Sequence, residues 1–123
     1  MVNITEDKVR ERRNNLLNLL DALEEGRYEQ TTQVLRGEDG YCIGGVMCDM
    51  SDLGKRELVG RDWQFRVGHS RAKFHRDIPP EVIRHYGMPK SLSGLLIIKN
   101  DQRKSFRALA TFIRQWMEVP SQD

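Results

Sequence analysis

LRGEDGYCIGGVMCDM, residues 35–50, is the stretch of sequence that decides the fold, because it contains four of the ten glycines and both cysteines. Glycine has no Cβ, so it lets two backbone segments approach closely and adopt conformations that other residues avoid. Since the four glycines lie within nine residues, the stretch specifies backbone geometry rather than side-chain chemistry. It therefore predicts a turn that leads into a tightly packed element.

Within and after this stretch, the apolar pattern predicts a short helix and a small sheet. Residues 43–50 place apolar side chains at the period of a buried helix, and residues 51–60 predict a loop. Residues 62–68 alternate apolar and polar side chains, as is typical of a half-buried strand. Two partners remain open for this strand: a short extended segment around Val34 and the extended segment 71–78.

Before the glycine-rich stretch, the sequence predicts one long helix over residues 6–25. Thr5 is a suitable N-cap, and Gly26 is suited to the left-handed position after the last turn. Apolar residues recur at helical spacing along one face, which predicts that this face packs against the core: Val9, Leu16, Leu17, Leu19, Leu20 and Leu23.

The region after the sheet predicts two further helices. Two consecutive prolines suit the first positions of a short helix over residues 80–86. Residues 92–99 are apolar on nearly all sides, so they predict a helix central to the core, capped by Ser91. The polar pair Asn100-Asp101 predicts the end of this helix.

The strongest helical period of the chain predicts its last helix. Ser105 is a suitable cap, and residues 106–117 carry apolar side chains along one face. This helix and the preceding one predict a hairpin, and residues 120–123 predict a frayed tail. Together the elements predict an α+β fold: a mainly helical single domain over residues 1–123, with a C-terminal helical hairpin and a small two- or three-stranded sheet.

Composition sets the expected environment of the protein. The 123 residues are 38% hydrophobic and 31% charged, and no window approaches the roughly 18 apolar residues that a membrane span needs. The first 13 residues lack the apolar core of a secretory signal, so the sequence predicts a cytoplasmic protein with no membrane contact. In a reducing compartment, two cysteines are expected to be free and buried.

No pattern of catalytic or metal-binding residues accompanies the glycine-rich stretch. Cys42 and Cys48 are too far apart for usual zinc modules, and apolar neighbours flank both thiols. The glycines are not followed by the lysine of a phosphate-binding loop. The sequence therefore predicts a protein without enzymatic activity, catalytic residues, metal or cofactor.

The two halves of the chain carry opposite charge. Residues 1–54 contain 6 lysines and arginines against 11 acidic residues, whereas residues 55–123 contain 14 against 7. One interpretation is an anionic partner for the basic half. The other is an internal match, in which the acidic N-terminal helix lies against a basic C-terminal surface.

Two runs of sequence resemble small uncharacterised proteins encoded in bacteriophage and prophage genomes. They are LR..DGYC..GVMCD over residues 35–49 and IKND...SF..LA over residues 98–110. The resemblance implies an accessory protein acting inside an infected bacterium, and it brings no catalytic or binding residues with it. The chain departs from the pattern at Ile43 and Gly44, where those relatives tend to have a cysteine and a leucine.

Three functional hypotheses follow from these observations. The first is a non-catalytic accessory protein of the phage type that binds a host macromolecule, most simply a host protein, in host takeover or counter-defence. Its contact surface is predicted to be a basic patch of six residues: Arg66, Arg71, Lys73, Arg76, Arg103 and Arg107. The sequence does not specify an oligomeric state.

The other two hypotheses use different ligands. A nucleic-acid-binding regulator would place the cations of the C-terminal hairpin along a duplex, in the manner of a helix-turn-helix unit. A small nucleotide-ligand binder would use the glycine-rich stretch, with Arg36 as a clamp, Tyr41 as a stacking platform and backbone amides of Gly44 and Gly45 near the ligand.

Overall fold

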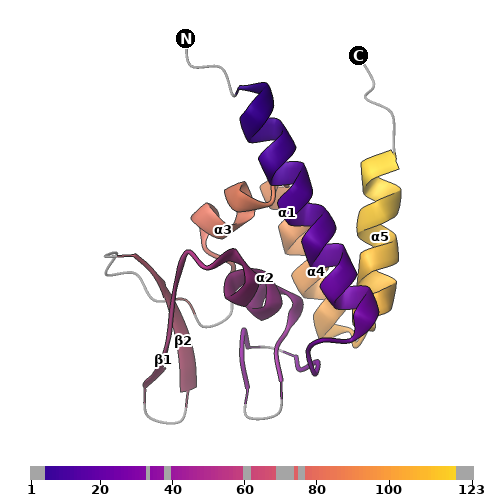
Figure 1. Cartoon of the computed structure of the whole chain (residues 1–123). Helices are drawn as coiled ribbons and strands as arrows, with labels where there is room; N and C mark the ends of the chain where they lie inside the picture. Colours follow the sequence, from indigo (N-terminus) through magenta and orange to yellow (C-terminus); the bar gives the residue numbers. More distant parts are fainter. Residues whose placement is uncertain are drawn as a thin grey trace.

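The computed structural model of the chain describes residues 5–32, 34–37, 40–59, 62–68, 74 and 77–118. Over these residues it has an α+β fold that is mainly helical, with a two-stranded antiparallel sheet beside the helices (Figure 1). The elements are α1 (Glu6–Glu25), α2 (Ile43–Ser51), β1 (Gly54–Val59), β2 (Asp62–Val67), α3 (Pro80–His85), α4 (Lys90–Asp101) and α5 (Phe106–Glu118). No helix in this described part is long and apolar enough to cross a bilayer.

Helix α1 begins and ends at the residues that its sequence predicts. The Thr5 side chain accepts a hydrogen bond of 3.2 Å from the Lys8 amide, and Gly26 adopts φ 71° after the last turn. The helix packs against α5, which lies beside the C-terminal part of α1 in Figure 1. Its buried face consists of Leu16, Leu19, Leu20, Ala22 and Leu23.

The sheet is a hairpin of β1 and β2, so the prediction of a loop over residues 51–60 is wrong at residues 54–59. Strand β1 pairs with β2 in antiparallel register, with Arg56 opposite Phe65 and Leu58 opposite Trp63. The loop prediction failed because three consecutive charged residues begin the strand after Gly54, which hides the apolar alternation of an ordinary half-buried strand.

Neither partner proposed for β2 from the sequence forms the hairpin. Phe74, from segment 71–78, makes one antiparallel bridge to Phe65 with two hydrogen bonds of 2.8 Å. The rest of that segment before residue 77 lies outside the described residues. The region around Val34 does not join the sheet, and the neighbouring Arg36 forms a bridge with Tyr41 instead.

The C-terminal hairpin is formed by α4 and α5 as predicted, but α4 has different ends. Pro89, not Ser91, occupies the N-cap, and the helix continues through Asp101. Helix α4 is also less central than its composition predicts, because Leu95 and Ile98 are 46% and 54% exposed. In α5 the Ser105 hydroxyl accepts a hydrogen bond of 3.1 Å from the Ala108 amide, which confirms the predicted cap.

The paired glycines mark a crossing of two backbone segments. A Cβ built at Gly45 would overlap the carbonyl oxygen of Leu35, and one built at Gly44 would lie 2.8 Å from side-chain carbons of Leu35 and Ile78. The crossing is fixed by a hydrogen bond of 3.2 Å from the Cys42 amide to the Leu35 carbonyl. The glycine-rich stretch therefore packs α2 tightly against its neighbours, as the sequence predicts.

Candidate functional site

The structure separates the described members of the predicted basic patch. Arg66 lies on β2, where its guanidinium forms an ion pair of 2.5 Å with Glu57. Arg103 lies in the turn before α5 and Arg107 in the first turn of α5, on the opposite side of α2 from the sheet (Figure 1). The other three members of the patch lie outside the described residues: Arg71, Lys73 and Arg76.

Arg103 and Arg107 belong instead to a local group of cations at the turn between α4 and α5. We call this group the basic corner: Lys99, Arg103, Lys104 and Arg107. Arg103, Lys104 and Arg107 are exposed and Lys99 is partly exposed, and none of the four forms an ion pair within the described part of the chain. Lys99 lies over the Phe112 ring at 4.6 Å, and Arg107 donates to the backbone carbonyl of Glu24 at 3.3 Å.

A third cation of α5 is paired with the N-terminal helix. The Arg114 guanidinium makes two hydrogen bonds to the Glu24 carboxylate, of 2.6 and 3.0 Å, and lies 3.8 Å from Asp21. The hydrogen bond from Arg114 holds the pKa of Glu24 below its usual value. Here the acidic N-terminal helix pairs with a cation of the basic half, which is the internal match that the sequence suggested. Arg114 is therefore not available to a duplex.

This ion pair predicts a measurable loss of stability in acid. Because the pKa of Glu24 is lowered in the folded state, its contribution is complete above the ordinary value of 4.5 and disappears as the pH falls below it. Both side chains are more than one-third exposed, so solvent screens the ion pair and we expect a small effect. Urea unfolding at pH 7 and pH 3 should show a smaller pH difference for Glu24→Gln and for Arg114→Gln than for the wild type. An unchanged difference would contradict this assignment.

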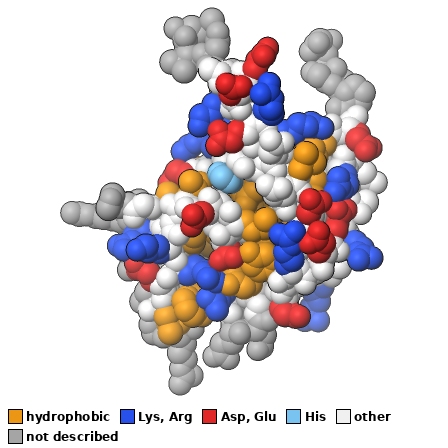
Figure 2. All heavy atoms as spheres, viewed as in Figure 1, with side chains coloured by type: hydrophobic (Ala, Val, Ile, Leu, Met, Phe, Trp, Pro, Cys, Tyr) orange, Lys and Arg blue, Asp and Glu red, His pale blue; other side chains and the backbone are white. Residues whose placement is uncertain are grey.

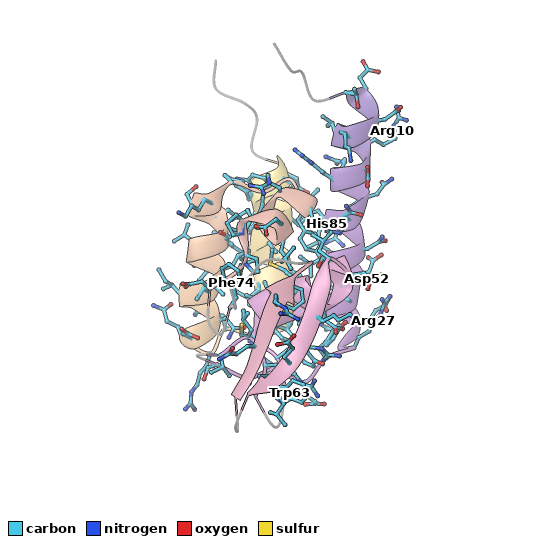
Figure 3. All side chains as sticks on the ribbon, turned by 90° about the vertical axis from the view of Figure 1, so that its left-hand side faces the viewer. Arg10, Arg27, Asp52, Trp63, Phe74 and His85 are labelled. Atoms are coloured by element: carbon cyan, nitrogen blue, oxygen red, sulfur yellow. The ribbon has the colours of Figure 1, made fainter. Side chains whose placement is uncertain are left out.

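Arginine and aromatic side chains converge where the sheet approaches the glycine-rich stretch. We call this group the stacked cluster: Arg36, Tyr41, Arg56 and Trp63. The Arg36 guanidinium carbon lies 4.0 Å from the centre of the Trp63 ring and 5.3 Å from the centre of the Tyr41 ring. Figure 3 shows Trp63 at the lower end of the two strands. These distances are those of cation–π contacts.

The second arginine of the cluster is held by hydrogen bonds. Arg56 donates to the Tyr41 hydroxyl and lies 3.3 Å from the Asp49 carboxylate. Tyr28 donates to the other oxygen of Asp49 at 2.6 Å, and its ring meets Tyr41 edge-on at 5.0 Å. Burial, followed by this hydrogen bond, raises the pKa of Tyr28, which therefore remains a donor at neutral pH.

Local structure explains how four separated positions meet. A backbone bridge places Arg36 opposite Tyr41, so the turn between them brings both side chains to one place. On the hairpin, Arg56 and Trp63 lie on one face, because Trp63 pairs with Leu58, two residues beyond Arg56. The sequence identified Arg36 and Tyr41 as possible ligand contacts. It gave no signal for Arg56, since this residue falls in the predicted loop.

The surface beside the stacked cluster is shallow and carries both signs of charge. A hollow of about 380 Å³ is lined by the cluster residues other than Tyr41, together with Asp49, Asp52 and Lys55. Lysine and arginine side chains are interspersed with acidic ones over the face drawn in Figure 2. Such a surface suits a partner that itself carries both charges better than it suits a polyanion.

Gly44 and Gly45 lie in packed surroundings and not in an open phosphate site. Both residues are buried against neighbouring segments. The first amide of α2, that of Ile43, donates to the Asn100 side chain at 3.0 Å. Of the four residues that the sequence predicted to contact a nucleotide, Arg36 and Tyr41 are partly exposed, whereas the two glycines are buried.

The two thiols are buried and free. Cys42 and Cys48 are 3% and 2% exposed, which confirms their predicted place in the core. Burial raises the pKa of the Cys42 thiol to about 11 and raises that of Cys48 as well. Among the described residues no group of three or more histidine, cysteine or acidic side chains is arranged to hold a metal.

Burial predicts that both thiols are inert in the folded protein. At pH 8 we expect alkylation by iodoacetamide to be about a hundredfold slower than for an unfolded chain, because the thiolate is scarce and enclosed. The rate should be followed by mass spectrometry in buffer and in denaturant. Rapid modification of either cysteine in the native protein would contradict the buried environment.

The fold and its surfaces define a small, mainly helical α+β domain with two distinct groups of exposed or partly exposed cations. Residues 16–92 match the model of a family described as Domain of unknown function (DUF8296), and the chain belongs to this family. No curated protein and no solved structure matches the chain significantly. The stacked cluster lies within the matched residues, whereas the basic corner lies beyond them.

Proposed function

We propose that this protein is a non-catalytic accessory protein of the phage type, which acts in the cytoplasm of a bacterial host by binding a host protein. The observation that carries the proposal is the stacked cluster, in which Arg36 lies against Trp63 on a surface of mixed charge. The partner would bind over this cluster, not over the six-residue patch that the sequence suggested.

The composition of the cluster supports a protein partner. Arginine, tryptophan and tyrosine are the side chains most enriched among residues that dominate binding energy at protein interfaces. The Arg36 guanidinium is oriented by two rings, so less conformational entropy is lost when a partner immobilises it. Leu58 is 57% exposed and pairs with Trp63 across the hairpin, which adds an apolar side chain to the same face.

The pairing of charges near the cluster supports the same conclusion. Arg56 is paired with Asp49, and Arg66 on the opposite face of the sheet is paired with Glu57. A polyanion would have to compete with these carboxylates, whereas a protein surface with its own acidic and basic groups can satisfy both signs.

The basic corner supports a second candidate, nucleic-acid binding. Its four cations have no ion-pair partner within the described chain, and Arg103 holds a left-handed conformation with φ 66°. A residue other than glycine in this conformation is strained. Arg103 is exposed at this turn, so a phosphate could contact it without opening an internal ion pair.

Affinity capture from a bacterial host tests the first candidate. The baits would be the wild type, Arg36→Ala with Trp63→Ala, and a matched control, Arg10→Ala with Trp116→Ala, which removes the same side-chain types elsewhere. A protein retained after nuclease treatment by the wild type and the control, but lost from the cluster variant, is the expected result. Equal retention by all three folded baits would reject the stacked cluster as the contact surface.

The second candidate is tested by its dependence on salt. If phosphates bind the basic corner, the affinity for a single-stranded or duplex oligonucleotide should fall steeply from 50 to 200 mM salt. Arg103→Glu with Arg107→Glu should abolish that binding, and Arg10→Glu with Arg13→Glu on α1 should preserve it. A flat salt response, or equal binding by both variants, would reject nucleic acid as the ligand of this corner.

A further inference from the structure

A large hollow lies between α3 and α4, away from both groups of cations. Its volume is about 790 Å³, and its walls are mainly apolar: Ile78, Ile83, Met88 and Ile97, with Phe74 at one side. Figure 3 shows Phe74 near the α4 ribbon. Pockets that bind small molecules have volumes of roughly 300–1,000 Å³ and walls of this composition. We call this feature the α3–α4 groove.

Gly94 opens one wall of the groove. It lies in the middle of α4 and is exposed, and a Cβ built there would meet no atom within 4 Å. Glycine in a helix interior costs about 1 kcal/mol relative to alanine. Gly44 and Gly45 are required by close packing, but the packing of the chain gives no such reason at Gly94. Its absent side chain leaves room for a molecule in the groove.

The rim of the groove is cationic. Lys90 and Arg84 line it and are exposed. Within the described residues Lys90 forms no ion pair, and Arg84 reaches Glu81 only at 4.0 Å. Among the described residues that line the groove, one is acidic, Asp77, and two are cationic, so the lining carries a net positive charge. An apolar hollow with this rim is complementary to an apolar molecule that carries one negative charge.

We propose that the α3–α4 groove is a binding site for a small apolar carboxylate, such as a medium-chain fatty acid. The hydrocarbon part would be buried against the apolar walls beside Gly94, and burial of each CH₂ is favourable by roughly 0.8 kcal/mol. The carboxylate would accept charge-assisted hydrogen bonds from Lys90 and Arg84 at the rim. The site shares no residue with the stacked cluster or the basic corner, so it goes beyond the proposed function and is independent of it.

Calorimetric titration with decanoate and with 1-decanol tests the site. We expect saturable one-to-one binding of decanoate and weaker binding of the neutral alcohol. Lys90→Gln should weaken decanoate binding about fivefold, the size of an exposed charge contact, and leave the alcohol unaffected. Equal affinity for the acid and the alcohol in the wild type, or no change in Lys90→Gln, would overturn the role of the rim.

Gly94→Leu tests the walls without endangering the fold. The leucine side chain would enter the open space of the groove, and replacing a mid-helix glycine should raise the melting temperature. Decanoate affinity should fall at least about tenfold, since the pocket volume is occupied. The matched control is Ser91→Leu, which adds the same side chain to an exposed position of α4 outside the groove. Decanoate binding that is unchanged in Gly94→Leu, or lost equally in Ser91→Leu, would overturn the proposal.

Discussion

Replacement of Asn100 by alanine is expected to lower the free energy of unfolding by about 3 kcal/mol, because it leaves several buried polar groups without partners. Asn100 is 0% exposed. Its oxygen accepts from the Ile43 amide at 3.0 Å and from the Gln30 side chain at 3.1 Å. Its nitrogen donates to the Thr31 carbonyl at 2.8 Å. One side chain on α4 thus satisfies groups on the chain before α2 and on α2 itself.

Equilibrium unfolding in urea, followed by circular dichroism, measures this effect. Gln102→Ala is the matched control, because Gln102 is an exposed amide two residues further along the chain. It should change the stability by less than about 0.5 kcal/mol, as is usual for surface substitutions. A loss below 1 kcal/mol in Asn100→Ala would show that these hydrogen bonds do not hold the two parts of the chain together.

Gly45→Ala is expected to be at least as damaging, for a steric reason. The added methyl group would overlap the Leu35 carbonyl oxygen, which is backbone and cannot rotate away. Helix α2 and the segment at Leu35 would have to separate, which breaks the hydrogen bond between Cys42 and Leu35. Overpacking typically costs about 1–3 kcal/mol, and we expect the upper end of this range or more because no flexible side chain can yield here.

The same substitution elsewhere provides the control for this prediction. Gly94→Ala introduces the same methyl group into a helix where it meets no atom, so it should stabilise the fold by about 0.5–1 kcal/mol. Thermal unfolding of the two variants should shift in opposite directions. Equal shifts would show that the crossing at Gly45 is looser than the structure indicates.

The helices could be predicted because their signals are local. Thr5, Gly26 and Ser105 act on backbone groups within one turn, so the sequence around them determines the caps. The apolar period of α5 likewise determined which face it buries. The close packing at Gly44 and Gly45 was also predictable, since few other arrangements require two adjacent glycines in the first turn of a buried helix.

The strand β1 and the stacked cluster could not be predicted, because they depend on contacts between distant residues. Lys55 and Glu57 give β1 a polar character, and its strand conformation comes from pairing with β2. Arg56 becomes part of a site through Tyr41 and Asp49, which precede the hairpin. No spacing in the sequence records these contacts.

Polar residues at element ends were the most misleading signal. Asn100 is a residue type that is common at helix ends, where side chains are usually exposed. Its side chain is instead buried and makes the long-range hydrogen bonds described above. The described members of the basic patch are separated for a related reason. Arg66 lies on β2 and Arg103 lies in the turn between α4 and α5, so two residues of the same charge are far apart in the fold.

The position of Asn100 has a consequence for how this family should be delimited. The matched segment stops at residue 92, but the carboxamide that completes the first turn of α2 comes from residue 100. Gln30, inside the segment, in turn accepts a hydrogen bond from the Phe106 amide, outside it. The segment by which the family is recognised is therefore shorter than the unit that these hydrogen bonds join. A fragment that keeps them has to extend into α5.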